Sequence, residues 1–193
     1  MTEDEFVAWC DEDVKAEWVD GEVIIMGTAS TRHVRLTGFV YRVFSEFVEV
    51  RQLGEVFGPE LQIRLAAQRR RRVPDLFFVA RERLHLLTPQ HFEGVPDLIV
   101  EIVSPDSQAR DWREKYLEYE AVGVREYWVS DPMSQRVEAY ALGAERKFER
   151  IAEVDDRIAS TVLPGLYLRP SWLFAAEFRS PRTVLREIGV VSA

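Results

Sequence analysis

Residues 98–103 read Leu-Ile-Val-Glu-Ile-Val and residues 76–79 read Leu-Phe-Phe-Val, so two nearly continuous apolar runs occupy the middle of the chain. Runs of this kind are typical of strands that are covered on both faces of a sheet. The run 61–65 alternates between apolar and polar residues, which predicts one buried face. A fourth strand-like run, 126–129, follows a glycine that ends a helical pattern. We expect all four runs to lie in one sheet.

Helical patterns flank these strands. Residues 2–10 begin with threonine and acids, which predicts a short helix. Apolar residues recur at helical spacing over 31–50, and Ser30 or Thr31 can cap this helix. Another helix is expected over 107–122, and we expect this helix and the 31–50 helix to pack against the sheet. This order of elements predicts the α/β class in an α+β mixed arrangement, with a central mixed β-sheet flanked by helices.

The length of 193 residues is sufficient for one hydrophobic core, and we expect a single domain over 1–180 and a loosely held tail over 181–193. Asp20-Gly21, between two strand-like runs, predicts a β-hairpin. No apolar stretch approaches the roughly 18 to 20 residues that cross a membrane, and the acidic start is unlike a secretion signal. Cys10 is the only cysteine, so no intrachain disulfide can form. We therefore expect a cytoplasmic protein.

The net charge of −8 argues against a protein that coats nucleic acid through charge alone. Arg69, Arg70, Arg71 and Arg72 form the one strongly basic run. Such a run is usually a solvated loop, and a loop that contacts phosphate is the alternative. The balance of charge by itself decides neither.

Several common catalytic patterns are missing. The chain has no glycine-rich phosphate loop, no Gly-x-Ser-x-Gly turn and no His-Glu-x-x-His helix. The three histidines His33, His85 and His91 show no ligand spacing, so we expect them at surface or helix positions.

Two acids stand where acids are unusual. Glu101 lies within an apolar run, and burying a lone carboxylate is costly unless it is paired or coordinated. Asp75 directly precedes another apolar run. Glu101 could instead pair with one of the 22 arginines, and Asp75 could serve a turn or strand edge. Together, two carboxylates at the ends of adjacent buried strands predict a Mg²⁺ site.

Asp97 follows a proline, as Asp75 does, and competes for the same role. Asp97 and Glu101 lie on one strand, however, and four residues at roughly 3.3 Å each separate them by about 13 Å. One ion with ligands at about 2 Å cannot bridge that distance. We therefore assign the predicted site to Asp75 and Glu101.

Lys115 is the third candidate. With about 100° per residue, it lies roughly 40° from Tyr119 and 20° from Val122, inside the apolar stripe of the predicted helix. A lysine on a core-facing side is uncommon. The alternative is a side chain that reaches solvent from the edge of the stripe. The chain has three lysines against 22 arginines, which hints that a compact ammonium is needed here.

These residues resemble a known family, the Uma-two family, which is grouped with restriction endonucleases of the PD-(D/E)XK nuclease superfamily. The resemblance runs in order from about Thr2 to Phe174. It rests on residues 16–22, 73–76, 96–105, 111–119 and 123–128.

The resemblance implies a restriction-endonuclease-like core with Asp75 and Glu101 as metal ligands, and Glu17 matches an acid contributed early in such folds. The superfamily pattern expects a lysine two residues after the glutamate, but this position is Val103. Lys115 on the next helix is the natural substitute.

The favoured hypothesis is an endonuclease that uses Mg²⁺ or Mn²⁺ to hydrolyse DNA phosphodiester bonds, with Asp75, Glu101, Lys115 and Glu17 in its catalytic site. Cutting both strands would favour a homodimer. The first alternative is a catalytically weak or inactive module that binds DNA or another protein, as the acidic composition and the missing strand lysine suggest. The second is a metal-dependent hydrolase with another substrate, since a fold does not fix a substrate.

Overall fold

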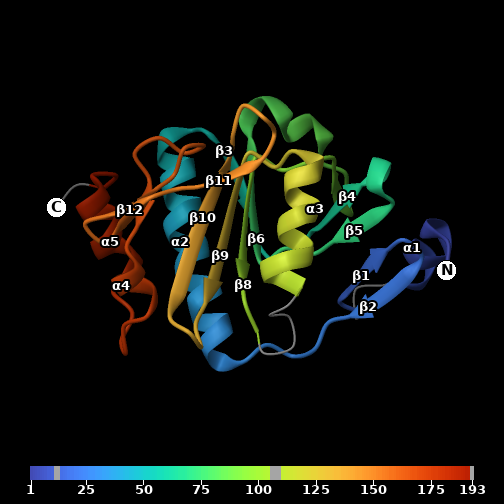
Figure 1. Ribbon diagram of the computed structural model, residues 1–193, viewed down its shortest axis with the longest axis horizontal. Coiled ribbons are helices and arrows are strands. Elements are labelled where there is room, and N and C mark those ends of the chain that lie inside the picture. The colour runs from blue at the N-terminus through green and yellow to red at the C-terminus, as the bar shows by residue number, and fades with distance from the viewer. Residues whose placement is uncertain (11–13, 105–109, 192–193) are drawn as a thin grey trace.

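The structure is a computed structural model that describes residues 1–10, 14–104 and 110–191 (Figure 1). Two large sheets form its framework. The larger sheet has six strands in the order β11-β10-β9-β8-β6-β3. It is mixed, because β8 and β9 are parallel while the other neighbouring pairs are antiparallel. Its strands are β3 (Gly54–Phe57), β6 (Leu76–Ala80), β8 (Leu98–Ile102), β9 (Glu126–Asp131), β10 (Arg136–Leu142) and β11 (Phe148–Arg150).

The central strands β6 and β8 are buried along their whole length. Leu76 and Val100 face a core shared with α2 (Thr31–Arg51), whereas Phe77 and Ile99 face a second core shared with α3 (Lys115–Val122). Figure 1 shows both helices beside the sheet. Helices on both faces explain why these two runs of the sequence are apolar without alternation.

Local signals set the ends of α2 and α3, the two helices that pack against the central sheet. The Ser30 side chain caps α2 by accepting the backbone N–H of His33 at 3.2 Å, and Gln52, in the left-handed conformation, caps the other end after Arg51. A π-helical turn, η3 (Arg110–Glu114), precedes α3, and Gly123 ends α3 with a φ of 90°. The first residues of the helix expected from 107 lie outside the described residues.

The second sheet contains five strands in the order β2-β1-β5-β4-β7, and α1 (Glu3–Trp9) packs beside it. The predicted hairpin is present, with Asp20 and Gly21 at positive φ between its first two strands. The strands are β1 (Ala16–Val19), β2 (Glu22–Ile25), β4 (Gln62–Leu65), β5 (Arg70–Arg72) and β7 (His91–Glu93).

The prediction that 61–65 joins the central sheet is wrong, because β4 pairs with β5 and β7 in the second sheet. Its alternation is nevertheless real. Ile63 and Leu65 are buried in the same core as Phe77, so β4 covers the face of the central sheet instead of extending it. The other three runs, in β6, β8 and β9, do lie in one sheet as expected.

The C-terminal region also differs from the expected tail. Residues 181–188 form α5 (Pro181–Ile188), and the buried side chains of Val184 and Leu185 join the core beside α2. The remaining elements are two 3-10 helices, η1 (Ala66–Gln68) and η2 (Arg81–Leu86), the small sheet of β12 (Glu153–Val154), β13 (Arg157–Ala159) and β14 (Tyr167–Leu168), and α4 (Pro170–Leu173). Among the described residues, no helix is both long and apolar enough to span a membrane.

Candidate active site

Asp75 and Glu101 occupy the same end of the β6–β8 pair. Leu76 lies opposite Val100, and the register continued by one residue sets Asp75 opposite Glu101. Asp75 Oδ2 accepts the backbone N–H of Ile102 at 2.7 Å, which ties its carboxylate to the end of β8. Asp75 is 8% exposed and Glu101 is 2% exposed. Two buried carboxylates thus flank one strand end.

Asp97 has the equivalent position at the opposite end of this pair. Its Oδ2 accepts the backbone N–H of Ala80 at 2.9 Å, and its Oδ1 pairs with Arg83 at 3.0 Å. The residue four positions after Asp97 is Glu101, whereas the residue four positions after Asp75 is Val79. Each end of the strand pair therefore has its own aspartate that accepts a backbone N–H from the neighbouring strand. Only the end with Asp75 also has a carboxylate, Glu101, on the opposite strand.

Lys115 lies between two buried glutamates. Its Nζ is 2.9 Å from Glu101 Oε1 and 3.5 Å from Glu17 Oε1, and the residue is 2% exposed. The alternative in which Lys115 reaches solvent is therefore wrong. The expected orientation toward Glu101 is present, but Glu17, instead of Asp75, is the second anion beside the ammonium.

Tyr119 supplies a second donor to the same oxygen of Glu101. Its hydroxyl is 3.0 Å from Glu101 Oε1 and is buried. Burial, followed by the charge of Glu101, raises the pKa of Tyr119 well above its usual value. Tyr119 therefore stays protonated and acts as a hydrogen-bond donor. The apolar stripe of the helix identified it as a core residue but not as a donor to the site.

Glu17 connects Lys115 to a buried ion-pair network. Its Oε2 is 2.7 Å from Arg72 Nη1, and its Oε1 accepts the N–H of Val73 at 3.2 Å. Burial alone would raise the pKa of Glu17, but the charges of Lys115 and Arg72 outweigh it and lower the pKa to about 2. Arg72 also forms two hydrogen bonds with Glu118, at 3.0 and 2.5 Å.

Three residues of the arginine run, Arg70, Arg71 and Arg72, form a strand and not a solvated loop, whereas Arg69 before them is exposed. Arg70 pairs with Asp20 and Glu118. Arg71 and Arg72 are 7% and 1% exposed, and both are paired with glutamates of α1 or β1. These three arginines form β5, and the pairs of Arg70 and Arg72 with Glu118 join the second sheet to α3. Sequence spacing could not indicate this, because the partners lie 46 to 68 residues away.

His33 was not predicted as part of the site. Its Nε2 lies 2.9 Å from Asp75 Oδ1, so the first turn of α2 is fixed to the carboxylate. The two residues are separated by 42 positions, and no motif links them.

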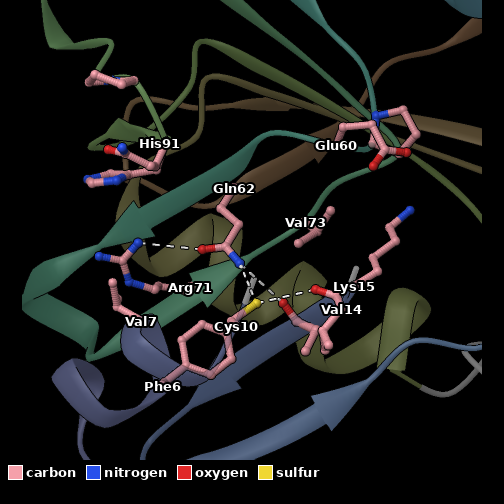
Figure 2. Close-up of a pocket in the computed structure, with 14 residues that line it drawn as sticks. Phe6, Val7, Cys10, Val14, Lys15, Glu60, Gln62, Arg71, Val73 and His91 are labelled. Carbon is pink, nitrogen blue, oxygen red and sulfur yellow. Dashed lines mark hydrogen bonds between the residues drawn. The ribbon is translucent and has the colours of Figure 1, made fainter. Parts of the chain in front are cut away.

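Two grooves lie near these residues. The larger, about 700 Å³, lies between α1 and the second sheet and contains none of the predicted site residues (Figure 2). In it, Gln62 bonds Arg71 at 3.5 Å and Cys10 at 3.7 Å. The other, about 640 Å³, lies between the first half of α2 and residues 57–61, and Asp75 lines it. We call this second cavity the α2 groove.

The described residues contain no group of three or more His, Cys, Asp or Glu side chains arranged to hold a metal. A site based on two carboxylates remains chemically suitable for Mg²⁺, which is commonly held by one or two carboxylates together with water and phosphate oxygens. The pair Asp75 and Glu101 fits that donor set.

Known proteins resemble this chain, one in sequence and one in fold. An uncharacterized protein of Synechocystis sp., sll1609, is 28% identical over 135 residues, which cover 69% of this chain and 76% of that protein. A crystal structure from Anabaena variabilis ATCC 29413, described as "a putative nuclease belonging to DUF820", superposes with a TM-score of 0.75 at 22% identity. It covers 90% of this chain and 97% of the other, and confirms the predicted fold class. A family model matches residues 3–171. The chain belongs to that family, Uma2, described as "Putative restriction endonuclease".

Proposed function

We propose that this protein is a divalent-metal-dependent endonuclease that hydrolyses phosphodiester bonds in DNA. The observation that carries the proposal is the pairing of two buried carboxylates, Asp75 and Glu101, at one end of β6 and β8, with the Lys115 ammonium 2.9 Å from Glu101. The family description and the likeness to a protein described as a nuclease support the same reaction class.

Asp75 and Glu101 are the residues that would hold Mg²⁺ or Mn²⁺. When bound, such an ion polarises the scissile phosphate and activates water for attack. The protein contributes preorganisation: Ile102 N–H and His33 fix Asp75, while Lys115 and Tyr119 fix Glu101 Oε1. These contacts hold both carboxylates in place before DNA binds.

Lys115 would stabilise the charge that develops on the phosphate or orient the attacking water. Glu17 is a positioning residue in this proposal, because it contacts Lys115 and Arg72 within the protein interior. Its low pKa keeps it anionic at neutral pH, so it holds the ammonium beside Glu101.

The test is nicking or linearisation of a supercoiled plasmid in the presence of Mg²⁺ or Mn²⁺. Cleavage by the unaltered protein should disappear in Asp75→Asn and in Glu101→Gln. Asp97→Asn is the matched control, because Asp97 caps the opposite end of the same strand pair through an equivalent hydrogen bond. Equal loss in Asp75→Asn and Asp97→Asn would assign the effect to folding and contradict the proposal.

Lys115 is tested separately. Lys115→Ala should lower the cleavage rate by about 100-fold or more, the usual effect of removing a donor that stabilises the transition state. Lys115→Arg should recover only part of the rate, since a planar guanidinium does not replace a compact ammonium. The control is Lys147→Ala, which removes an exposed ammonium that pairs with Glu120 of α3 from the turn between β10 and β11. DNA binding without cleavage in either metal would instead support the non-catalytic module.

A further inference from the structure

The α2 groove opens directly beside the candidate active site. His33, Thr37 and Tyr41 follow one another at four-residue spacing along its α2 wall, and Asp75, which contacts His33, also lines the groove. Tyr41 is 37% exposed, and Phe57 contributes a second aromatic ring from the opposite side. A volume of about 640 Å³ is within the range of ligand sites.

Gly38 keeps this groove open. It lies in the middle of the 21-residue helix α2, where glycine costs about 1 kcal/mol relative to alanine. A Cβ added at Gly38 would meet no atom within 4 Å, and its φ is not in the left-handed region. Neither packing nor backbone conformation therefore requires a glycine. The residue does line the groove, so the space that it leaves is available to a ligand.

The groove also has unused hydrogen-bonding groups in its α2 wall. Thr37 is 8% exposed, and its hydroxyl has no hydrogen-bond partner within the described part of the chain. The same holds for Nδ1 of His33, one helical turn earlier. Threonine in a helix populates two χ1 rotamers, so rotation can turn this hydroxyl toward a bound molecule. Buried polar groups of this kind usually have partners, which points to a ligand.

The residues that line the groove include one cation, Lys15, and two carboxylates, Glu60 and Asp75. Arg32 and Arg35 are exposed on the turns of α2 that carry His33, but neither lines the groove. These three cations form no ion pair with other described residues, although ion pairs occupy most arginines of the second sheet. The rings of Tyr41 and Phe57, with the Lys15 ammonium among the same lining residues, are groups that stack a base and contact its phosphate.

We propose that the α2 groove binds an unpaired nucleobase of the DNA strand whose phosphate is cleaved, so that the preferred substrate contains single-stranded or unstacked nucleotides. This inference rests on the proposed function. Tyr41 would stack on the base, and the Thr37 hydroxyl would bond its edge, as in enzymes that take a base out of the helix.

The test measures binding separately from cleavage. A fluorescein-labelled single strand and the duplex of the same sequence are titrated by fluorescence anisotropy with Ca²⁺ as the divalent ion. The single strand should bind more tightly. Tyr41→Ala should weaken its binding about fivefold or more, the usual effect of losing one stacked base, while Tyr41→Phe should not. Trp9→Ala removes an equally exposed aromatic residue outside the groove and is the matched control.

Gly38→Leu separates a binding defect from a folding defect. Leucine is a far better helix former than glycine, so the melting temperature should be unchanged or higher. Its side chain enters the groove, and affinity for the single strand should fall as far as in Tyr41→Ala. Unchanged affinity in both variants overturns the subsite. Equal affinity for single strand and duplex does the same.

The two proposals fail in different ways. Normal plasmid cleavage with unaltered single-strand binding in Gly38→Leu refutes the subsite alone, whereas tight, Tyr41-dependent binding without cleavage refutes the nuclease alone. Size-exclusion chromatography tests whether a second copy of the chain, instead of DNA, occupies the groove. A dimer that Tyr41→Ala converts to a monomer, with DNA binding unchanged, would assign the groove to a second copy of the chain.

Discussion

Replacing Glu17 with glutamine should strongly destabilise the fold at neutral pH. Glu17 is 1% exposed and is held by Arg72 at 2.7 Å and Lys115 at 3.5 Å. Glutamine has the shape of the protonated acid but no charge, so Glu17→Gln leaves two buried cations with one anion fewer. Breaking a buried ion pair from one side typically costs about 3–5 kcal/mol.

The lowered pKa of Glu17 gives an independent magnitude and a pH dependence. A shift from 4.5 to about 2 corresponds to about 3 kcal/mol, at about 1.4 kcal/mol per unit. Because the folded pKa is depressed, this stability is fully present above pH 4.5 and is lost as the pH falls toward 2. The difference between the two proteins should therefore shrink from about 3 kcal/mol at pH 7 to about 1 kcal/mol at pH 3.

Urea unfolding at both pH values measures this difference, provided that the dependence on urea is the same for both proteins. The matched control is Glu138→Gln. Glu138 is also buried, but the side chains of Arg136 and Arg150, its partners, are 60% and 58% exposed and stay hydrated without it. Glu138→Gln should lower the free energy of unfolding by clearly less than Glu17→Gln does. An equal cost for both variants, or a cost for Glu17→Gln that does not change with pH, would refute the reasoning.

Three further predictions concern stability. Gly123→Ala should lower the melting temperature by roughly 2–4 °C, since a left-handed non-glycine residue costs about 1 kcal/mol at the end of α3; an unchanged value would contradict this. Deleting 181–193 should cost about 3 kcal/mol or more in urea unfolding, because it exposes the apolar surface that Val184 and Leu185 cover. A fully stable truncated protein would restore the tail interpretation. Lys147→Ala should leave the urea-unfolding midpoint essentially unchanged in the same assay, since its ammonium is 71% exposed.

Local patterns in the sequence were sufficient for the helices, the hairpin and the central strands. The capping serine and the apolar spacing gave α2 to within a residue or two, and Asp20-Gly21 gave the turn of the hairpin. These features depend on residues a few positions apart, whose backbone preferences the sequence records directly. The same is true of the continuous apolar runs in β6 and β8.

The candidate site was partly visible for a related reason. Glu101 and Lys115 are charged residues inside apolar patterns, and burial of both is what the structure has. A charge that interrupts a local pattern can be recognised without knowing its partner. Asp75 and Glu17 had weaker local signals, and the resemblance to a family identified Glu17.

Tertiary structure alone decided which residues meet. Alternation in β4 indicated one buried face but could not say which sheet it joins, because strand pairing depends on distant partners. The arginines of β5, the contact of His33 with Asp75 and the packing of α5 on α2 have the same origin. The sequence indicates that a side chain requires a partner, such as a counter-ion for a buried charge. The identity of that partner depends on chain topology, since folding brings together residues that are far apart in the sequence.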